Sequence, residues 1–334
     1  MPSSLRKLVS EVTVTSVTLI AWGQTPAPPE PVIRVTVDLV VVDAQVVHKK
    51  TGRPVGALKR EDFELSEDGV RQELVAFSQD RLPLSIVFPF DLTESVRPVL
   101  KPLASGALAA LQHLKPEDET AVMVYAASAK LLQDFTTDRA LTVAAIEKAS
   151  EMDSNEEAYF NEGVFQAAVQ AGKAKNPGSR RVIVWLTDNV PNVPSEPSLH
   201  TEIDALHELL ESGTVVSSLL ERSAMSNTFM VLYTKNPVFA AVRKHHPPGD
   251  VYKYAEQTGG QVMKSSKEEV AAKLADLIDQ IRTRYSLGYR SSVDQPPGKF
   301  CEIKLSVSTD VVKREGQVVV KAKRGYYRRA ASGG

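Results

Sequence analysis

Two short acidic motifs in the sequence carry residue types that bind hard cations. The first, Asp91-x-Thr93-x-Ser95, follows the apolar segment Leu84–Val87. The second, Leu186-Thr187-Asp188, closes the apolar segment Arg181–Leu186. A carboxylate followed by hydroxyls two and four positions later offers oxygen atoms from a single turn, and Mg²⁺ prefers oxygen ligands. The motifs therefore indicate one divalent-cation site, provided that the fold brings Asp91 and Asp188 together.

The apolar segments before the motifs are typical of strands in a parallel sheet. Arg181–Leu186 is the most continuous of them, as expected where helices cover both faces of a sheet. Segments with helical periodicity alternate with such runs through residues 81–284, which predicts a doubly wound, mostly parallel α/β sheet. Ligands bind these sheets at the carboxyl ends of the strands. We therefore expect Asp91 and Asp188 at one edge, on neighbouring strands.

The other elements of residues 81–284 follow from the same periodicity. The stretch Ser223–Asp250 is irregular and is assigned no element. Gly259 and Gly260 are expected to end a helix, because glycine readily adopts the left-handed conformation found after helix C-termini. The expected helices are Val96–Leu114, Arg139–Ser150, Gly163–Lys175, Leu199–Ser212 and Lys267–Arg284, and the further strands are Thr120–Tyr125 and Val215–Leu220.

Both ends of the chain outside this domain are predicted to be β structure. In residues 32–80, Glu67-Asp68-Gly69 has the composition of a hairpin turn. A short meander is marginally stable alone, so we expect residues 285–328 to pack with residues 32–80 in an accessory all-β domain, as one small sheet or sandwich. The expected strands are Ile33–Val41, Asp62–Leu65, Val70–Phe77, Tyr285–Tyr289, Phe300–Val307 and Val318–Lys323.

The N-terminus has the layout of a secretory signal peptide over residues 1–23. Arg6 and Lys7 precede the mostly apolar run Val12–Trp22, which is too short to span a bilayer. A proline-rich linker occupies residues 24–31, and residues 329–334 form a tail. The pattern predicts a secreted or periplasmic protein with no transmembrane segment in the mature chain.

Composition excludes several classes of function. The 334 residues carry 40 basic and 41 acidic side chains, so no global charge favours a nucleic-acid partner. Cys301 is the single cysteine, which excludes an intrachain disulfide framework and multi-cysteine zinc sites. On its predicted strand, Cys301 is expected to be a small core residue.

The ordered set of motifs resembles the von Willebrand factor A domain. Asp91-x-Thr93-x-Ser95 looks like the first motif of the family's metal-ion-dependent adhesion site, and Leu186-Thr187-Asp188 looks like the third. The flanking motifs resemble a bacterial branch, abundant in acidobacteria, in which β segments bracket the A domain. The resemblance runs from Ile33 to Tyr327, and the flanking motifs are Glu61–Gly69, Thr258-Gly259-Gly260, Tyr285–Tyr289 and Lys323–Tyr327.

This resemblance implies a protein-binding module and not an enzyme. In the family, Mg²⁺ or Mn²⁺ is held by the aspartate and hydroxyls of the first motif, a threonine from a middle loop, and the aspartate of the third motif. The matching residues are Asp91, Thr93, Ser95 and Asp188. A partner protein supplies an acidic side chain to the open position, and the resemblance does not identify that partner.

The sequence departs from the family pattern at two positions. Glu157 stands where the threonine of the middle loop is expected, and Pro89 interrupts what should be a central strand. Proline removes a ladder hydrogen bond, so we expect this strand to end or bulge early and to displace Asp91. Two interpretations stay open: Glu157 is itself a metal ligand, or the site has degenerated and its residues are turn and helix-cap residues.

Two further functions are alternatives to metal-dependent binding. Asp91-x-Thr93 faintly resembles the nucleophile loop of haloacid-dehalogenase-type phosphohydrolases, in which Asp91 would be the nucleophile. The other alternative is a metal-free interaction scaffold whose contacts lie on Ser223–Asp250. The acidic loop Glu151–Glu162 is expected to be solvated and, beside an ion, to favour basic partners.

Overall fold

The structure is a computed structural model that describes residues 39–79, 82–152, 154, 159–189, 200–221, 224–238, 240 and 250–328. The predicted signal peptide, linker and C-terminal tail lie outside the described residues, as does Glu157. The part of the predicted strand Ile33–Val41 before Leu39 also lies outside them. Among the described helices, none is both long and apolar enough to cross a bilayer.

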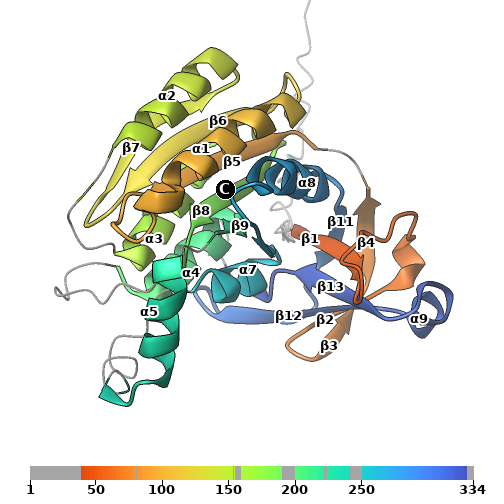
Figure 1. The fold of residues 1–334 in the computed structure, drawn as a ribbon. Helices are drawn as coiled ribbons and strands as arrows, with labels where there is room; N and C mark the ends of the chain where they lie inside the picture. The colour runs from red at the N-terminus through yellow and green to blue at the C-terminus, as the bar shows by residue number, and fades with distance from the viewer. Residues whose placement is uncertain are drawn as a thin grey trace, which may run out of the picture. The chain divides into compact units, whose positions relative to one another are not determined.

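A six-stranded sheet forms the centre of the α/β domain (Figure 1), in the order β10-β9-β8-β5-β6-β7. Neighbouring strands are parallel except β6 and β7, which are antiparallel. The predicted doubly wound, mostly parallel class is therefore confirmed. The strands are β5 (Leu84–Asp91), β6 (Glu119–Tyr125), β7 (Ala129–Thr136), β8 (Arg180–Thr187), β9 (Val215–Leu220) and β10 (Val262–Lys264).

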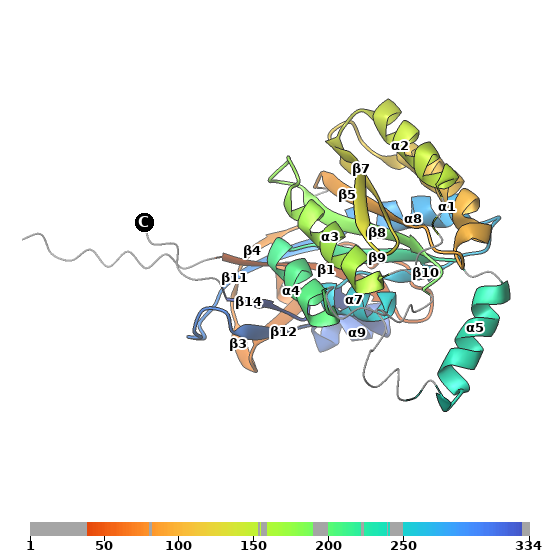
Figure 2. The same cartoon turned by 90° about the vertical axis from the view of Figure 1, so that its left-hand side faces the viewer.

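Helices cover both faces of this sheet, as Figures 1 and 2 show. Side chains of β5 alternate between two hydrophobic cores, with Ile86 in one and Val87 in the other. The first core packs against α1 (Arg97–Ala110), η2 (Leu111–His113), α2 (Arg139–Glu151) and α8 (Val270–Arg282). The second packs against α3 (Phe160–Gly172), α4 (Glu202–Ser212) and α7 (Val251–Thr258). Burial on both faces explains the continuous apolar runs in the sequence.

Strands from the two ends of the chain pair with each other in two four-stranded sheets. The first sheet has the order β13-β1-β11-β4 and the second the order β14-β12-β2-β3. Both contribute to one core, which includes Tyr285 and Tyr289. The strands are β1 (Leu39–His48), β2 (Phe63–Glu67), β3 (Val70–Gln72), β4 (Leu74–Ser78), β11 (Tyr285–Arg290), β12 (Phe300–Val307), β13 (Val318–Ala322) and β14 (Gly325–Tyr327).

Some elements differ from those predicted. The expected single strand Val70–Phe77 divides into β3 and β4, which belong to different sheets. A helix, α5 (Ala224–Lys235), lies in the stretch that was assigned no element. The short helices η1 (Arg60–Asp62) and α9 (Thr309–Glu315) were not predicted either, because segments of three to seven residues show little periodicity.

The expectation that the strand ends or bulges early at Pro89 is wrong. β5 continues to Asp91, and its pairing with β6 is unbroken from Ser85 to Asp91. On the other side, the register with β8 runs from Leu84 to Val87 and resumes only at Phe90. The proline therefore interrupts the ladder locally on one side, and the intact β6 side keeps Asp91 at the end of the strand.

Two buried arginines link elements that lie far apart in the sequence. Arg180, at the start of β8, donates from Nε to Asp43 Oδ2 of β1 over 3.1 Å. Arg282, at the end of α8, donates from Nη2 to Asp118 Oδ2 over 2.5 Å, and Asp118 is fully buried before β6. Burial opposes ionisation of Asp118, but hydrogen bonds from Arg282 and from backbone amides outweigh it and lower its pKa.

Candidate functional site

The candidate site lies where the order of the central sheet reverses. The chain enters at β5, places β6 on one side, and later adds β8 on the other side. Asp91 is the last residue of β5, and Asp188 follows the last residue of β8. Because β5 and β8 are parallel neighbours, their carboxyl ends meet at one edge of the sheet.

The first motif folds into one tight turn around the Asp91 carboxylate. Asp91 Oδ1 accepts hydrogen bonds from Thr93 N at 2.9 Å and from Thr93 Oγ1 at 2.6 Å. Ser95 Oγ lies 3.3 Å from Thr93 Oγ1. The N-cap of α1 is Val96, without a side-chain capping bond. Asp91 and Thr93 therefore form a turn with each other, and neither is the N-cap residue of α1.

The second oxygen of Asp91 is held by the neighbouring strands. Asp91 Oδ2 accepts hydrogen bonds from Tyr125 Oη at 2.8 Å and from Thr187 Oγ1 at 3.2 Å. Trp185 Nε1 donates to the Tyr125 hydroxyl at 3.3 Å. Tyr125 and Thr187 were not predicted as site residues, although each ends a strand beside β5. Their positions at or just after the ends of the predicted strands could have indicated that they belong to the site.

Asp91 and Asp188 form a pair of buried carboxylates. Asp91 is 3% exposed and Asp188 is fully buried. Burial, and then the charge of Asp188, raise the pKa of Asp91 to about 6 from the ordinary 3.8, although Thr93 and Tyr125 donate to it. Two buried carboxylates that repel each other are stabilised by a cation between them. The structure thus brings together all four predicted residues that it describes.

The donor atoms at this edge fit a hard divalent cation. The four predicted residues supply carboxylate and hydroxyl oxygens, which are the ligand types that Mg²⁺ and Mn²⁺ prefer. The fifth predicted ligand, Glu157, lies outside the described residues, so its role stays a prediction.

A protein-family match covers the part of the chain that contains Asp91 and Asp188. Residues 86–190 match the von Willebrand factor type A domain, a range that begins in β5 and ends just after Asp188. The chain contains a von Willebrand factor type A domain. The predicted family resemblance is confirmed for this A domain. No curated protein matches the chain.

Several solved structures match parts of this chain at low sequence identity. An aerotolerance-related membrane protein from Bacteroides fragilis is 14% identical, with 59% of this chain and 98% of that chain covered and a TM-score of 0.40. A von Willebrand factor type A protein from Catenulispora acidiphila is 10% identical. The match covers 83% of this chain and 76% of that chain, with a TM-score of 0.41. Proximal thread matrix protein 1 from the mussel byssus, with a zinc-occupied MIDAS motif, is 13% identical. The match covers 66% of this chain and 50% of that chain, with a TM-score of 0.41. At these values the likeness carries no conclusion about fold or binding.

Asn189 is a further residue of the A domain edge that the sequence did not reveal. Its φ of 53° is left-handed, a conformation in which asparagine is enriched. Its Oδ1 accepts from Val251 N at 3.1 Å, and its Nδ2 donates to Asp250 Oδ1 at 3.3 Å. Asn189 therefore fixes the turn after Asp188 to the N-terminus of α7.

A third buried carboxylate lies at the same edge, at the end of β9. Glu221 is 3% exposed, and its backbone N donates to Thr187 O at 3.3 Å. Burial raises its pKa above the ordinary value. The register pairs Thr187 with Leu220, which places Glu221 beside Asp188 along the edge. The edge of the A domain therefore concentrates negative charge beyond the two predicted aspartates.

The acidic loop Glu151–Glu162 was expected to be solvated, but Glu162 at its end is buried. Glu162, in the first turn of α3, is 8% exposed and lies 2.5 Å from His200 Nδ1. The His200 ring stacks on Phe165, with centroids 3.5 Å apart. This acidic residue is packed within the A domain, and its charge is directed at a histidine instead of at solvent.

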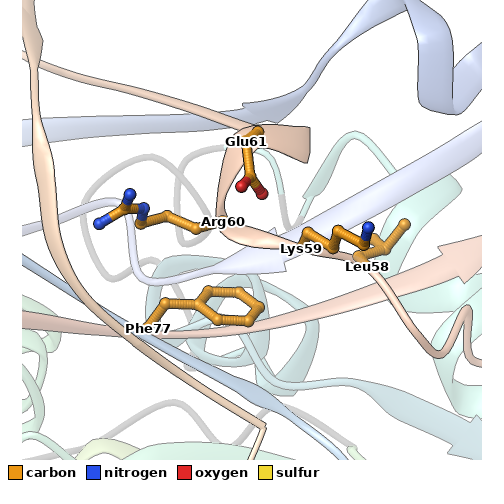
Figure 3. A pocket seen from close by; sticks show the side chains of 5 residues that line it. All are labelled: Leu58, Lys59, Arg60, Glu61 and Phe77. Atoms are coloured by element: carbon orange, nitrogen blue, oxygen red, sulfur yellow. The ribbon is translucent and has the colours of Figure 1, made fainter.

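A pocket lies apart from this edge, on η1 and β4 (Figure 3). It has a volume of about 410 Å³ and is lined by Leu58, Lys59, Arg60, Glu61 and Phe77. Lys59, Arg60 and Glu61 are exposed there. The pocket contains none of the predicted site residues.

Proposed function

We propose that the A domain binds Mg²⁺ or Mn²⁺ through Asp91, Thr93, Ser95 and Asp188 and recognises a partner protein at that edge. The observation that carries this proposal is the Asp91–Asp188 pair, whose burial and then mutual repulsion raise the pKa of Asp91. A bound divalent cation supplies positive charge that stabilises both ionised carboxylates and an acidic group of a partner.

Contacts within this chain hold the proposed ligand residues at that edge in place without a partner. Tyr125 and Thr187 orient the Asp91 carboxylate from the two flanking strands. Thr93 Oγ1 donates a hydrogen bond to Asp91, so the oxygen keeps lone-pair capacity with which it could ligate a cation. Asp188 is fully buried, so its position is set by the sheet and not by solvent.

The same contacts argue against the phosphohydrolase alternative. An aspartyl nucleophile needs an accessible carboxylate oxygen. Asp91 is 3% exposed, and both of its oxygens accept hydrogen bonds from this chain. The contacts of Asp91 therefore do not favour a nucleophilic role.

Calorimetric titration with Mg²⁺ and with Mn²⁺ tests the proposed site. We expect saturable heat with one ion per chain, abolished by Asp91→Ala and retained in the matched control Asp310→Asn on α9. Asp310 is exposed and pairs only with Lys313 among the ion pairs of the described residues. Absence of heat with both ions would refute the metal-dependent function.

A metal-free interaction scaffold is the second candidate function. Its supporting observation is α5, where Val231 and Leu232 are 51% and 55% exposed. A chelator distinguishes the two candidates, because an ion bound only to the native state raises its stability. The metal-dependent function predicts that chelator lowers the thermal midpoint of the protein as purified with Mg²⁺. An unchanged midpoint favours the scaffold.

We also propose that the chain is exported and that residues 1–23 are removed. The basis is the order of Arg6, Lys7 and the apolar run Val12–Trp22. Mass spectrometry of the protein from its native cell tests this proposal. The expected mass lacks the first 23 residues, whereas an intact N-terminus in the cytosolic fraction would contradict export.

A further inference from the structure

The Glu221 carboxylate, directly after β9, is buried without a partner for one of its oxygens. Glu221 is 3% exposed. Its Oε2 is buried and accepts no hydrogen bond from the described residues. A buried acceptor that lacks a donor is unfavourable, and more so when it carries a charge. This oxygen therefore points to a ligand that the neighbouring side chains do not supply.

The charged side chains near Glu221 do not neutralise it. Within the described ranges, Glu221 forms no ion pair. The charge of Lys267 lowers the pKa of Glu221 and that of Glu268 raises it, while burial has the largest effect and leaves the pKa raised. Lys267 and Glu268 are both exposed, so solvent screens their charges. The negative charge of Glu221 is therefore left for a cation at the edge of the A domain.

The strand register directs Glu221 to the same side of the sheet as Asp188. Glu221 N donates to Thr187 O, so β9 and β8 stay hydrogen-bonded one residue beyond their last register pair. Leu219 and Leu186 are register partners, and both belong to the same hydrophobic core. Side chains two residues apart on a strand point to the same face. Glu221 and Asp188 follow these leucines by two residues, so they share that face on neighbouring strands.

We infer that Glu221 is a positioning residue that accepts hydrogen bonds from the water molecules of a divalent cation held at Asp91 and Asp188. Mg²⁺ in proteins usually keeps several of its waters. An ionised carboxylate is an acceptor only, so both oxygens of Glu221 suit such waters. The inference rests on the proposed function, because it assigns Glu221 to the same ion.

Calorimetric titration of the full chain with Mg²⁺ tests this role. Glu221→Gln keeps the size of the side chain and removes its charge. We expect this variant to bind one ion per chain with an affinity at least about tenfold lower than that of the parent. Glu221→Asp keeps the charge and should bind more tightly than Glu221→Gln. The matched control Glu302→Gln, on an exposed residue of β12, should bind as the parent does.

A substitution of Lys267 separates this role from a purely structural one. If Glu221 served only to pair with Lys267, Glu221→Gln and Lys267→Met would both lower the thermal midpoint in chelator and leave the Mg²⁺ affinity unchanged. A role at the ion predicts that Lys267→Met binds Mg²⁺ at least as tightly as the parent, because a positive charge near the ion is removed.

The outcomes distinguish this inference from the proposed function. Absence of heat with the parent chain refutes both. Binding by the parent together with an equal affinity of folded Glu221→Gln overturns only the role of Glu221. Circular dichroism in chelator shows whether Glu221→Gln is folded. If it is not, Lys267→Met decides, and an affinity below that of the parent overturns the inference.

Discussion

Replacing Asp188 with asparagine should have opposite effects on metal binding and on metal-free stability. The pKa of Asp91 rises from 3.8 to about 6, which corresponds to about 3 kcal/mol of destabilisation when the carboxylate is ionised. Burial is the larger cause and Asp188 the second. Because Asp188→Asn removes only the second cause, we expect metal-free stability at neutral pH to increase by about 1 kcal/mol.

The pH dependence of stability gives this prediction a sign that can be checked. The folded chain holds the Asp91 proton more tightly than the unfolded chain between about pH 4 and pH 6. The contribution of Asp91 to the free energy of unfolding therefore falls as pH rises through this window. It is constant below the window, where both states are protonated, and again above it. Asp188→Asn should reduce the size of this fall.

Urea unfolding of the parent and variant chains measures both effects. In chelator, Asp188→Asn should be the more stable protein at neutral pH, and Mg²⁺ should stabilise the parent only. Asp310→Asn should behave as the parent does in both conditions. If Asp188→Asn is less stable than the parent in chelator and its pH dependence is unchanged, the two carboxylates do not repel each other and the reasoning fails.

Three other substitutions test separate contacts, each by urea unfolding. Arg282→Ala leaves the buried Asp118 without its partner and should lower the free energy of unfolding by about 3–5 kcal/mol, whereas Arg314→Ala in an exposed pair should change it little. Gly260→Ala places a Cβ against the Val216 carbonyl oxygen and should cost about 3 kcal/mol or more. Tyr125→Phe removes a donor to Asp91 Oδ2; it should cost about 1–3 kcal/mol and extend the Asp91-dependent fall in stability to higher pH, because the pKa of Asp91 rises in the folded state only. A loss for Arg282→Ala no greater than for Arg314→Ala, or a neutral effect of either of the others, would contradict the corresponding contact.

The sequence predicted best those elements whose burial leaves a strong pattern. The segments Arg181–Leu186 and Val215–Leu220 became β8 and β9 with little change, because both are covered on two faces. The edge strand β7 was missed because most of its side chains are exposed or half-buried, which gives only a weak apolar pattern. β10 and β14 have three residues each, too few to show a periodicity.

The candidate site was predictable where the spacing is local and, for Asp188, where neighbouring parallel strands end at one edge of the sheet. Asp91 and Thr93 lie two residues apart, so a single turn brings them together whatever the rest of the fold does. Tyr125 and Thr187 reach Asp91 through the registers of β6 and β8, which one sequence does not reveal. The effect of Pro89 was overestimated because β5 stays paired with β6 as far as Asp91.

Anomalous diffraction from crystals grown with Mn²⁺ would test most directly whether the A domain edge holds an ion. The proposed function predicts one anomalous peak between Asp91 and Asp188, contacting the Thr93 and Ser95 hydroxyls, and no such peak in Asp91→Ala crystals. Crystals in saturating Mn²⁺ with no peak at the carboxyl ends of β5 and β8 would contradict it.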